Sequence, residues 1–297
     1  QDGETEVIDA NLPDNVAIFA TAGLVSGEGA SMPGYTAGST VAGQFITRST
    51  DFDGYYLAGG VEFYPGENTM VGMSGYFSSL NADTPLRQQV ESDTYAASLY
   101  LRHAFAGGPV IDGQFSMGSM GFDTSRQVQF LGNAQTLQSS SDYMLVSGAL
   151  GVSYDLESSI GTISPGIEAR YANVDTAALN ETGGTLGLTL QRESFESKQV
   201  RVGLGYEKQG KSLAINANAQ LVREFEDGPQ LLGTNFVQGT GPTANFLLDT
   251  ADQTWGEVGI AAIFGTGPLQ FSAGIDTTIG RDNADAQVVR GSLTLRF

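Results

Sequence analysis

Histidine, serine and carboxylate side chains are the groups in this sequence that could do acid–base or nucleophilic chemistry, and histidine is the scarcest of them. The one histidine, His103, lies in Leu99-Tyr100-Leu101-Arg102-His103-Ala104-Phe105. A catalytic histidine needs a nucleophile and an orienting partner. His103 falls on the apolar register of an alternating segment, beside a short turn, and no companion serine stands out nearby. We therefore interpret it as an ordinary residue near a strand end.

Metal-ligating residues are also few. With no cysteine and one histidine, a zinc or other transition-metal site is not expected. Some acidic clusters could hold calcium weakly, but none has the spacing of a calcium loop, and solvated loop charge is the favoured interpretation. These clusters are Asp51/Asp53, Asp282/Asp285 and Glu224/Glu226/Asp227. No cofactor is predicted, because Gly59-Gly60 and Gly203-Leu204-Gly205 lack the helix pattern that follows a phosphate-binding loop.

Composition excludes one class of partner and one class of membrane protein. Lys and Arg number 14 against 33 acidic residues, and the resulting charge of -19 would repel nucleic acid. No apolar run reaches the roughly 18 residues that a membrane helix needs. The first six residues are polar and acidic, so no secretory signal is visible, and we expect the chain to be a mature or trimmed form.

The sequence from about residue 16 alternates between apolar and polar residues in segments of about ten residues, as β-strands do. At the C-terminus, Val289, Leu293 and Phe297 share one side with Gly291 and Leu295. The other side carries Arg290, Ser292, Thr294 and Arg296. A terminal aromatic on an apolar face needs a cover, and lipid provides one in a transmembrane β-barrel.

The connections between these segments are of two kinds, and their order predicts the topology. Five are short Gly/Pro-type turns, at 65–68, 106–109, 157–159, 209–211 and 265–268. Six are longer polar loops, near 26–53, 81–91, 123–141, 176–190, 226–252 and 281–285. Eleven connections join twelve strands, so we predict an all-β fold: a closed antiparallel transmembrane β-barrel of twelve strands over 16–297. Both of its ends then lie on the short-turn side.

One face of the predicted strands is too polar for a protein core. We expect its charged residues to line the lumen and to pair with one another in a wet interior, because their signs are mixed. A selectivity filter of one sign is the competing interpretation. The predicted lumen residues are Glu62, Arg102, Asp112, Glu168, Arg170, Arg201, Glu207, Glu257, Asp276, Arg290 and Arg296.

Aromatic residues cluster near the predicted strand ends, where an amphipathic ring suits the lipid headgroup layer. The preference of tyrosine for strands explains part of this pattern. The set is Tyr55, Tyr64, Tyr76, Tyr95, Phe105, Tyr143, Tyr154, Tyr171 and Tyr206.

Several fragments, in this order and at this spacing, resemble the β-domain of classical autotransporters, the translocator of type V secretion. The resemblance covers nearly all of 16–297, and no single motif decides it. The fragments are Phe52 to Phe63, Met70 to Tyr76, Phe122 to Arg126, Ser164 to Tyr171, Asn180 to Gly184, Gly280 to Asn283 and the terminal Phe297.

The resemblance implies a twelve-stranded bacterial outer-membrane barrel that brings an N-terminal passenger to the cell surface, with the linking segment held as a helix in the pore. It also implies that the barrel-assembly machinery reads Phe297. Residues 1–15 are expected to be a linker or pore segment, and Pro13 limits a helix there to about two turns. The other expected partners are outer-membrane lipid and lipopolysaccharide, and the barrel is expected to be a monomer without enzymatic activity.

Three other functions remain open at this point. A passive porin for small solutes is the first alternative, a structural or adhesive surface protein the second, and a barrel lipase or protease the last. An exported region encoded directly upstream of Gln1 would favour the translocator, whereas a signal peptide alone would favour the others.

Overall fold

The fold of the chain was taken from a computed structural model. It describes residues 15–29, 50–84, 88–130, 132–192, 194–226, 231–237, 244–247, 252–265, 268–281 and 284–296. In the part of the chain so described, no helix has the length and hydrophobicity for crossing a membrane.

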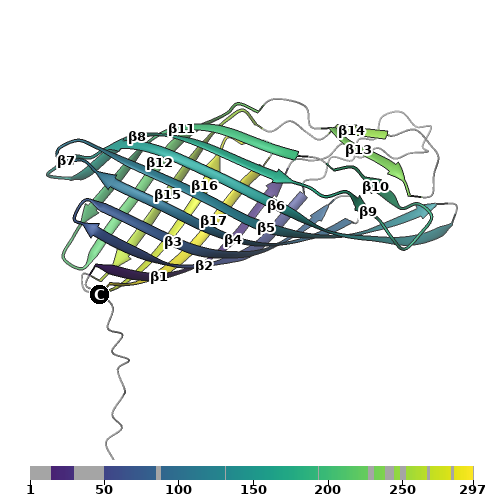
Figure 1. Ribbon diagram of the computed structural model, residues 1–297, viewed down its shortest axis with the longest axis horizontal. Coiled ribbons are helices and arrows are strands. Elements are labelled where there is room, and N and C mark those ends of the chain that lie inside the picture. Colours follow the sequence, from purple (N-terminus) through teal and green to yellow (C-terminus); the bar gives the residue numbers. More distant parts are fainter. Residues whose placement is uncertain are drawn as a thin grey trace, which may run out of the picture.

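The described residues form a closed antiparallel β-barrel (Figure 1). The main sheet has thirteen strands, of which twelve form the barrel and the short β7 (Leu156–Ser158) prolongs the turn before the seventh. The twelve are β1 (Val16–Gly29), β2 (Thr50–Gly66), β3 (Thr69–Thr84), β4 (Gln88–Ala104), β5 (Pro109–Phe130), β6 (Asn133–Tyr154), β8 (Gly161–Asp175), β11 (Ser194–Gln209), β12 (Leu213–Glu224), β15 (Thr254–Phe264), β16 (Leu269–Ile279) and β17 (Ala284–Arg296).

Closure joins the first barrel strand to the last. Along β1 and β17 the register runs from Ala17 opposite Arg296 to Gly29 opposite Ala284, and β8 pairs with β11 to complete the ring. Asn15 accepts a backbone hydrogen bond from Tyr64, beside the turn after β2. Both ends of the barrel sequence therefore lie at the short-turn end, as predicted. The predicted twelve-stranded closed barrel is confirmed.

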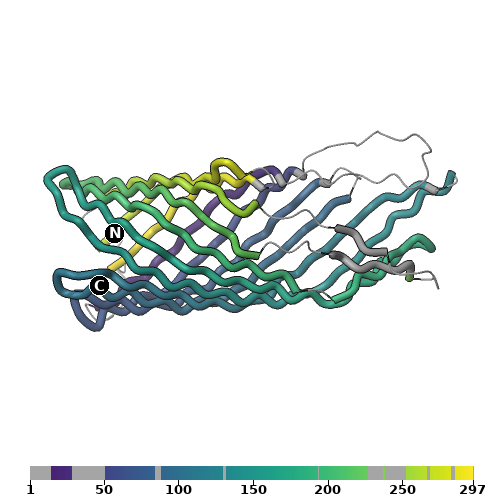
Figure 2. The backbone as a smooth tube through the Cα atoms, turned by 90° about the horizontal axis from the view of Figure 1, so that it is seen from above, coloured from purple at the N-terminus to yellow at the C-terminus, as the bar shows by residue number. Residues whose placement is uncertain are grey.

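The strands differ greatly in length. β5 and β6 have 22 residues each, whereas β16 has 11, which is about what a membrane-spanning strand needs. The surplus of β5 and β6 projects beyond the barrel at the long-loop end, as the tube in Figure 2 shows. Beside it lies a second, four-stranded sheet of β9 (Leu179–Asn180), β10 (Leu188–Leu190), β13 (Leu231–Phe236) and β14 (Ala244–Leu247).

Several predicted loops are wrong in extent. The segments 81–91 and 123–141 belong largely to the β3–β4 and β5–β6 hairpins, and 176–190 and 226–252 contain the strands of the small sheet. The hairpin stretches lack a continuous apolar face, so alternation did not mark them as strands. The strands of the small sheet have only 2 to 6 residues, too few to show a period. Cross-strand hydrogen bonds such as Thr124 to Ser139 at 2.6 Å support a β-ribbon that is polar on both faces.

One predicted turn is displaced, and one predicted loop lies mainly outside the described residues. The turn expected at 157–159 is at 159–160, because β7 pairs with the start of β8 and the Ser158 hydroxyl bonds the Gly161 carbonyl at 2.6 Å. Within the expected loop 26–53, β1 runs to Gly29 and β2 begins at Thr50. Residues 30–49 lie outside the described part.

Glycine on the polar side of the wall makes room for tyrosine rings. A Cβ at Gly72 would lie 2.2 Å from the Tyr100 ring, and one at Gly23 would lie 2.3 Å from the Tyr56 ring. Each ring therefore lies flat over the glycine of a neighbouring strand. This packing holds β1 to β2 and β3 to β4 through side chains as well as through backbone hydrogen bonds.

Candidate functional site: the polar face of the barrel

Each barrel strand presents two distinct faces. The apolar face carries the large exposed hydrophobic side chains, for example Leu57, Leu99, Leu150 and Leu221, which are 51% to 61% exposed. The polar face consists of the alternate residues. Because the register pairs residues of the same face, it relates the predicted lumen residues across strands. All eleven lie on the polar face.

Charged residues of the polar face form one row across five strands. Arg102 of β4 is paired with Asp112 of β5, which is paired with Gly151 of β6. Gly151 is paired with Glu168 of β8, and Glu168 with Arg201 of β11. A Cβ at Gly151 would lie 2.2 Å from Asp112, so the glycine leaves space for this carboxylate.

Arg201 is the centre of the largest charge cluster on this face. Its Nη1 lies 2.6 Å from Glu257 Oε2 and its Nε lies 3.9 Å from Glu168 Oε1. Glu168 also pairs with Arg170. The Arg201 side chain is only 11% exposed, so these carboxylates compensate a largely buried charge. A cavity of about 170 Å³ opens beside it, lined by Asp112, Glu168 and Arg201 among others.

The other predicted lumen residues have smaller sets of partners. Arg290 Nε lies 3.3 Å from Asp276 Oδ2. Glu62 accepts hydrogen bonds from the Tyr64 hydroxyl at 2.6 Å and the Tyr100 hydroxyl at 3.3 Å.

Three predicted residues lie near the short-turn end. Arg102 lies 4.0 Å from Asp155, a residue that the prediction omitted because it follows β6 in a turn. Glu207 accepts from Gln209 at 2.9 Å, and Arg296 is paired with Ala17 in the register. The structure thus brings most of the predicted charges into contact with a partner, in small groups rather than in one cluster.

Sequence reasoning missed an aromatic component of this face. Trp255, 3% exposed, donates from Nε1 to Glu257 Oε1 at 3.0 Å, and the Arg281 guanidinium lies over its ring at 4.4 Å from the centroid. The alternation of Trp255 with Glu257 could have revealed this position.

The interpretation of aromatic residues as headgroup anchors is wrong for Tyr64, Tyr76 and Tyr143. These three tyrosines lie on the polar face.

His103 contacts no carboxylate or serine among the described residues. Its Nδ1 lies 2.8 Å from the Thr69 hydroxyl, and its ring is perpendicular to that of Phe105, with 4.5 Å between the ring centroids.

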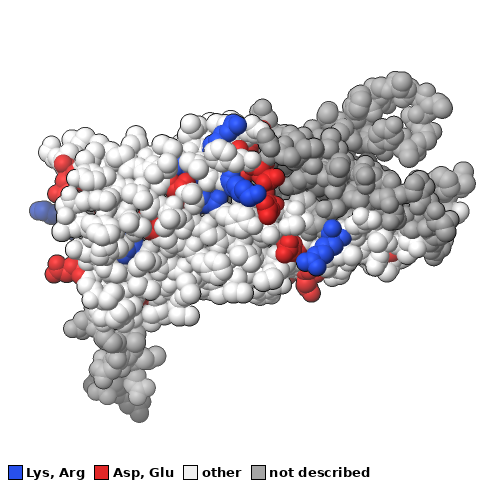
Figure 3. Space-filling view, turned by 45° about the horizontal axis from the view of Figure 1, so that its top comes forward, with Lys and Arg blue, Asp and Glu red and all other residues white. Residues whose placement is uncertain are grey.

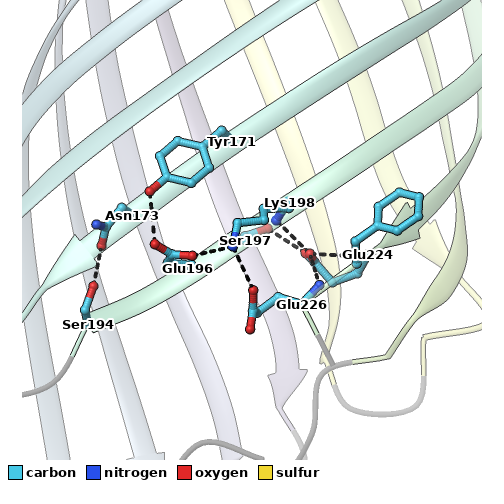
Figure 4. Close-up of polar contacts among 9 residues, drawn as sticks. Tyr171, Asn173, Ser194, Glu196, Ser197, Lys198, Glu224 and Glu226 are labelled. Carbon is cyan, nitrogen blue, oxygen red and sulfur yellow. Dashed lines mark hydrogen bonds and ion pairs between the residues drawn. The ribbon is translucent and has the colours of Figure 1, made fainter. Parts of the chain in front are cut away.

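Two of the three acidic clusters contribute residues that bond to protein groups. Asp51 and Asp53 of the third lie at the start of β2. Glu224 accepts hydrogen bonds from the Ser197 hydroxyl at 2.6 Å and the Lys198 amide at 2.7 Å (Figure 4). It also accepts from the Gln199 side chain at 3.2 Å and from the next two backbone amides. Burial alone would raise the pKa of Glu224, but these hydrogen bonds outweigh it and lower that pKa. Within the described ranges no three acidic or histidine side chains are grouped to hold a metal.

Other residues of the predicted acidic clusters lie partly within and partly outside the described part of the chain. Asp285 accepts from the Glu28 amide at 3.0 Å, whereas its predicted companion Asp282 lies outside the described residues, as does Asp227.

A sequence model of the autotransporter β-domain matches residues 33–277. The chain belongs to this family. It is therefore a translocator barrel of the bacterial outer membrane, and it is associated with a passenger segment. A search of curated proteins gave no match.

Solved structures share the fold. The translocator domain of the autotransporter NalP from Neisseria meningitidis superposes with a TM-score of 0.75 at 15% identity, covering 97% of this chain and 90% of that one. The β-domain of the Bordetella autotransporter BrkA superposes with a TM-score of 0.60 at 11% identity, covering 95% of this chain and 100% of that one. The P. putida toluene transporter TodX is also similar, with a TM-score of 0.56 at 10% identity, covering 96% of this chain and 91% of that one. At these identities the structures support the fold, and the family match supports the function.

Proposed function

We propose that this barrel passes an N-terminal passenger segment through its lumen, with the apolar face in lipid and the polar face around a hydrated path. The observation that carries the proposal is the closed ring of twelve strands with one apolar and one charged face. Closure satisfies every backbone group inside lipid. Figure 3 supports the assignment of faces, because the wall towards the short-turn end shows few charged side chains.

The lumen lining in this proposal consists of the eleven polar-face residues named above. Their ion pairs keep the charges at the wall and leave the middle of the barrel to water. Barrels of about eight strands are filled by side chains and those of about sixteen are open channels. A ring of twelve accordingly suits one extended or helical segment.

Residues 1–15 are proposed to be that segment's linker, with the barrel domain over 16–297. The stretch Gln1 to Asn15 has five acidic residues and no basic one. It precedes β1 at the short-turn end, and the proposed lumen wall contributes Arg102 and Arg296 at this same end. These two arginines give its acidic side chains cationic partners at the mouth of the lumen.

We further propose that the long-loop end faces outwards, that the barrel is monomeric and that it catalyses no reaction. The transport role of the family and the neutral surroundings of His103 support the last point. The alternative function is a passive channel. The toluene transporter TodX, which has a similar fold, favours this alternative.

The translocator proposal can be tested by display on cells. An epitope fused before Gln1, behind a secretory signal, should bind antibody on intact cells. The same epitope inserted at Gly107, in a short turn, should bind only after the outer membrane is opened. An epitope inserted within 238–243 reports that the barrel has assembled with its long loops outside. Surface exposure of the 238–243 epitope without that of the Gln1 fusion would favour the passive channel.

The pore-segment proposal has its own measurement. Deleting 1–15 should raise single-channel conductance in planar bilayers, because an occluding segment is removed. A matched chain with its acidic residues changed to Asn or Gln keeps the length and should give intermediate conductance. Equal conductance in all three chains would contradict occlusion.

A further inference from the structure

The apolar face changes character abruptly at the long-loop end. On β12, Leu221 is 59% exposed, and Arg223 follows on the same face two residues later. We call the residues of the apolar face beyond this last hydrophobic row the outer band. With the long loops outside, as proposed above, the outer band lies at the level of the outer-leaflet headgroups.

Most charged residues of the outer band are acidic. On β2 to β8 the register aligns its carboxylates on the apolar face, above side chains such as Leu57, Tyr95 and Met144. These carboxylates are Asp53, Asp83, Glu91, Asp93, Asp123, Asp142 and Asp175. An anionic headgroup is repelled along this arc.

Beyond this acidic arc, β11 and β12 carry two cations in the outer band. Among strand residues that the structure describes, Lys198 of β11 and Arg223 of β12 are the basic side chains of the outer band. Arg223 is paired with Val200, two residues from Lys198 on the same face, so the two cations are diagonal neighbours.

Arg223 is held in place by neutral groups. Its Nη1 donates to the Thr254 hydroxyl at 2.9 Å and its Nη2 to Gln253 Oε1 at 3.0 Å. No carboxylate of the described residues lies within ion-pair distance of it. These contacts use two of the five N–H donors of the guanidinium, and among the described residues the other three donors have no partner.

Lys198 is compensated, yet it also keeps a donor. Its Nζ lies 2.5 Å from Glu196 and 3.1 Å from Glu226, and hydrogen bonds to these carboxylates raise the pKa of Lys198 (Figure 4). Two of its three N–H groups are used. The Phe225 amide donates to the Lys198 carbonyl at 2.8 Å. Leu221 lies two residues before Arg223 on the same face and is exposed, so an apolar surface begins below the two cations.

We infer that the sector of Lys198, Arg223 and Thr254 binds a phosphate of an outer-leaflet glycolipid headgroup. Arg223 supplies a charge that no described carboxylate pairs with, and planar donors that suit phosphate oxygens, and Lys198 adds a second cationic donor. The lipid chains lie along Leu221. Within the described strands, this sector is the part of the outer band that carries cations, on a protein of charge -19.

The experiment counts lipid molecules on the folded barrel in detergent by native mass spectrometry. Bisphosphorylated lipid A should bind the unchanged barrel more tightly than lipid A treated with phosphatase. Arg223→Gln should weaken binding about three- to fivefold, as an exposed charge contact contributes. Arg223→Lys should restore part of it. The matched control is Lys208→Gln, an exposed lysine of β11 at the short-turn end, which should leave binding unchanged.

Three results would overturn the inference: equal losses for Lys208→Gln and Arg223→Gln, no loss for Arg223→Gln, or equal binding of the phosphate-free lipid. Excess inorganic phosphate that removes all lipid would instead indicate a site for free phosphate. The altered electrophoretic mobility of folded barrels before heating verifies that each variant is folded. Orientation is tested separately by the epitope within 238–243, so failure of lipid binding and failure of the proposed topology are distinguishable.

Discussion

At the scale of single residues, the two faces of the wall should tolerate a new charge very differently. Ile275 of β16 is 45% exposed on the apolar face, and Ile275→Arg should destabilise the folded barrel by about 2 to 4 kcal/mol in lipid. Gln220 lines the polar cavity beside Arg201, and Gln220→Arg is the matched control that should cost much less. Reversible urea unfolding in vesicles measures both. Equal costs would mean that the faces are misassigned.

Glu224 should make the start of the 226–252 segment sensitive to pH. Since folding lowers the pKa of Glu224, its contribution is complete above the pKa of the unfolded chain and is lost as pH falls through the folded value. Hydrogen exchange at the Lys198 and Phe225 amides, corrected for intrinsic rates, should therefore accelerate in acid. Glu224→Gln should exchange faster already at neutral pH and lose this dependence. An unchanged pH profile in Glu224→Gln would contradict the assignment.

At the scale of elements, close packing of a ring over glycine fixes neighbouring strands. Gly72→Ala should cost about 1 to 3 kcal/mol of stability, because the new methyl displaces the Tyr100 ring. Gly75→Ala, three residues along β3 where a Cβ meets nothing within 4 Å, should be neutral or slightly stabilising. Unfolding in detergent compares the two. A similar loss in both would attribute the effect to backbone conformation rather than to the ring.

A buried ion pair connects the β5–β6 hairpin to the segment around the small sheet, beside the backbone hydrogen bonds between Gln138 and Thr182. Arg126 Nε and Nη2 contact the two oxygens of Glu181 at 2.5 and 2.6 Å, and the Glu181 side chain is 5% exposed. Glu181 also accepts from the Leu188 amide at 2.8 Å. We expect Glu181→Ala to loosen 176–190, seen as faster protease cleavage there, while the barrel keeps its unfolding midpoint. A lower midpoint would show that this ion pair also supports the barrel.

At the scale of the whole molecule, assembly and stability should separate at Phe297. This residue lies outside the described part, and its role as an assembly signal is a prediction from the family resemblance. Deleting it should lower outer-membrane levels strongly in cells. Refolding in detergent should be nearly normal, with a loss of about 1 to 3 kcal/mol, the burial of one side chain. Normal levels in cells would restrict Phe297 to anchoring.

The sequence alone determined the closed barrel, its strand number and the sorting of residues between two faces. Strand period and turn chemistry are local properties, so Val289, Leu293 and Leu295 revealed their shared face without knowledge of their neighbours. The eleven polar-face charges were identified by the same alternation. The lengths of the short turns also predicted which strands are neighbours, because a tight turn can join only adjacent antiparallel strands.

Tertiary structure alone decided which polar segments are strands and which charges meet. The outer parts of β5 and β6 are polar on both faces, so no periodicity distinguished them from loops, and pairing between the two strands stabilises them. Arg201 meets Glu257 across 56 residues, because β12 pairs with both β11 and β15. Arg126 meets Glu181 across 55 residues, because the extended β5–β6 hairpin bonds to the segment after β9 through Gln138 and Thr182. Both contacts depend on strand pairing, and local residue patterns carry no information about which distant strands pair.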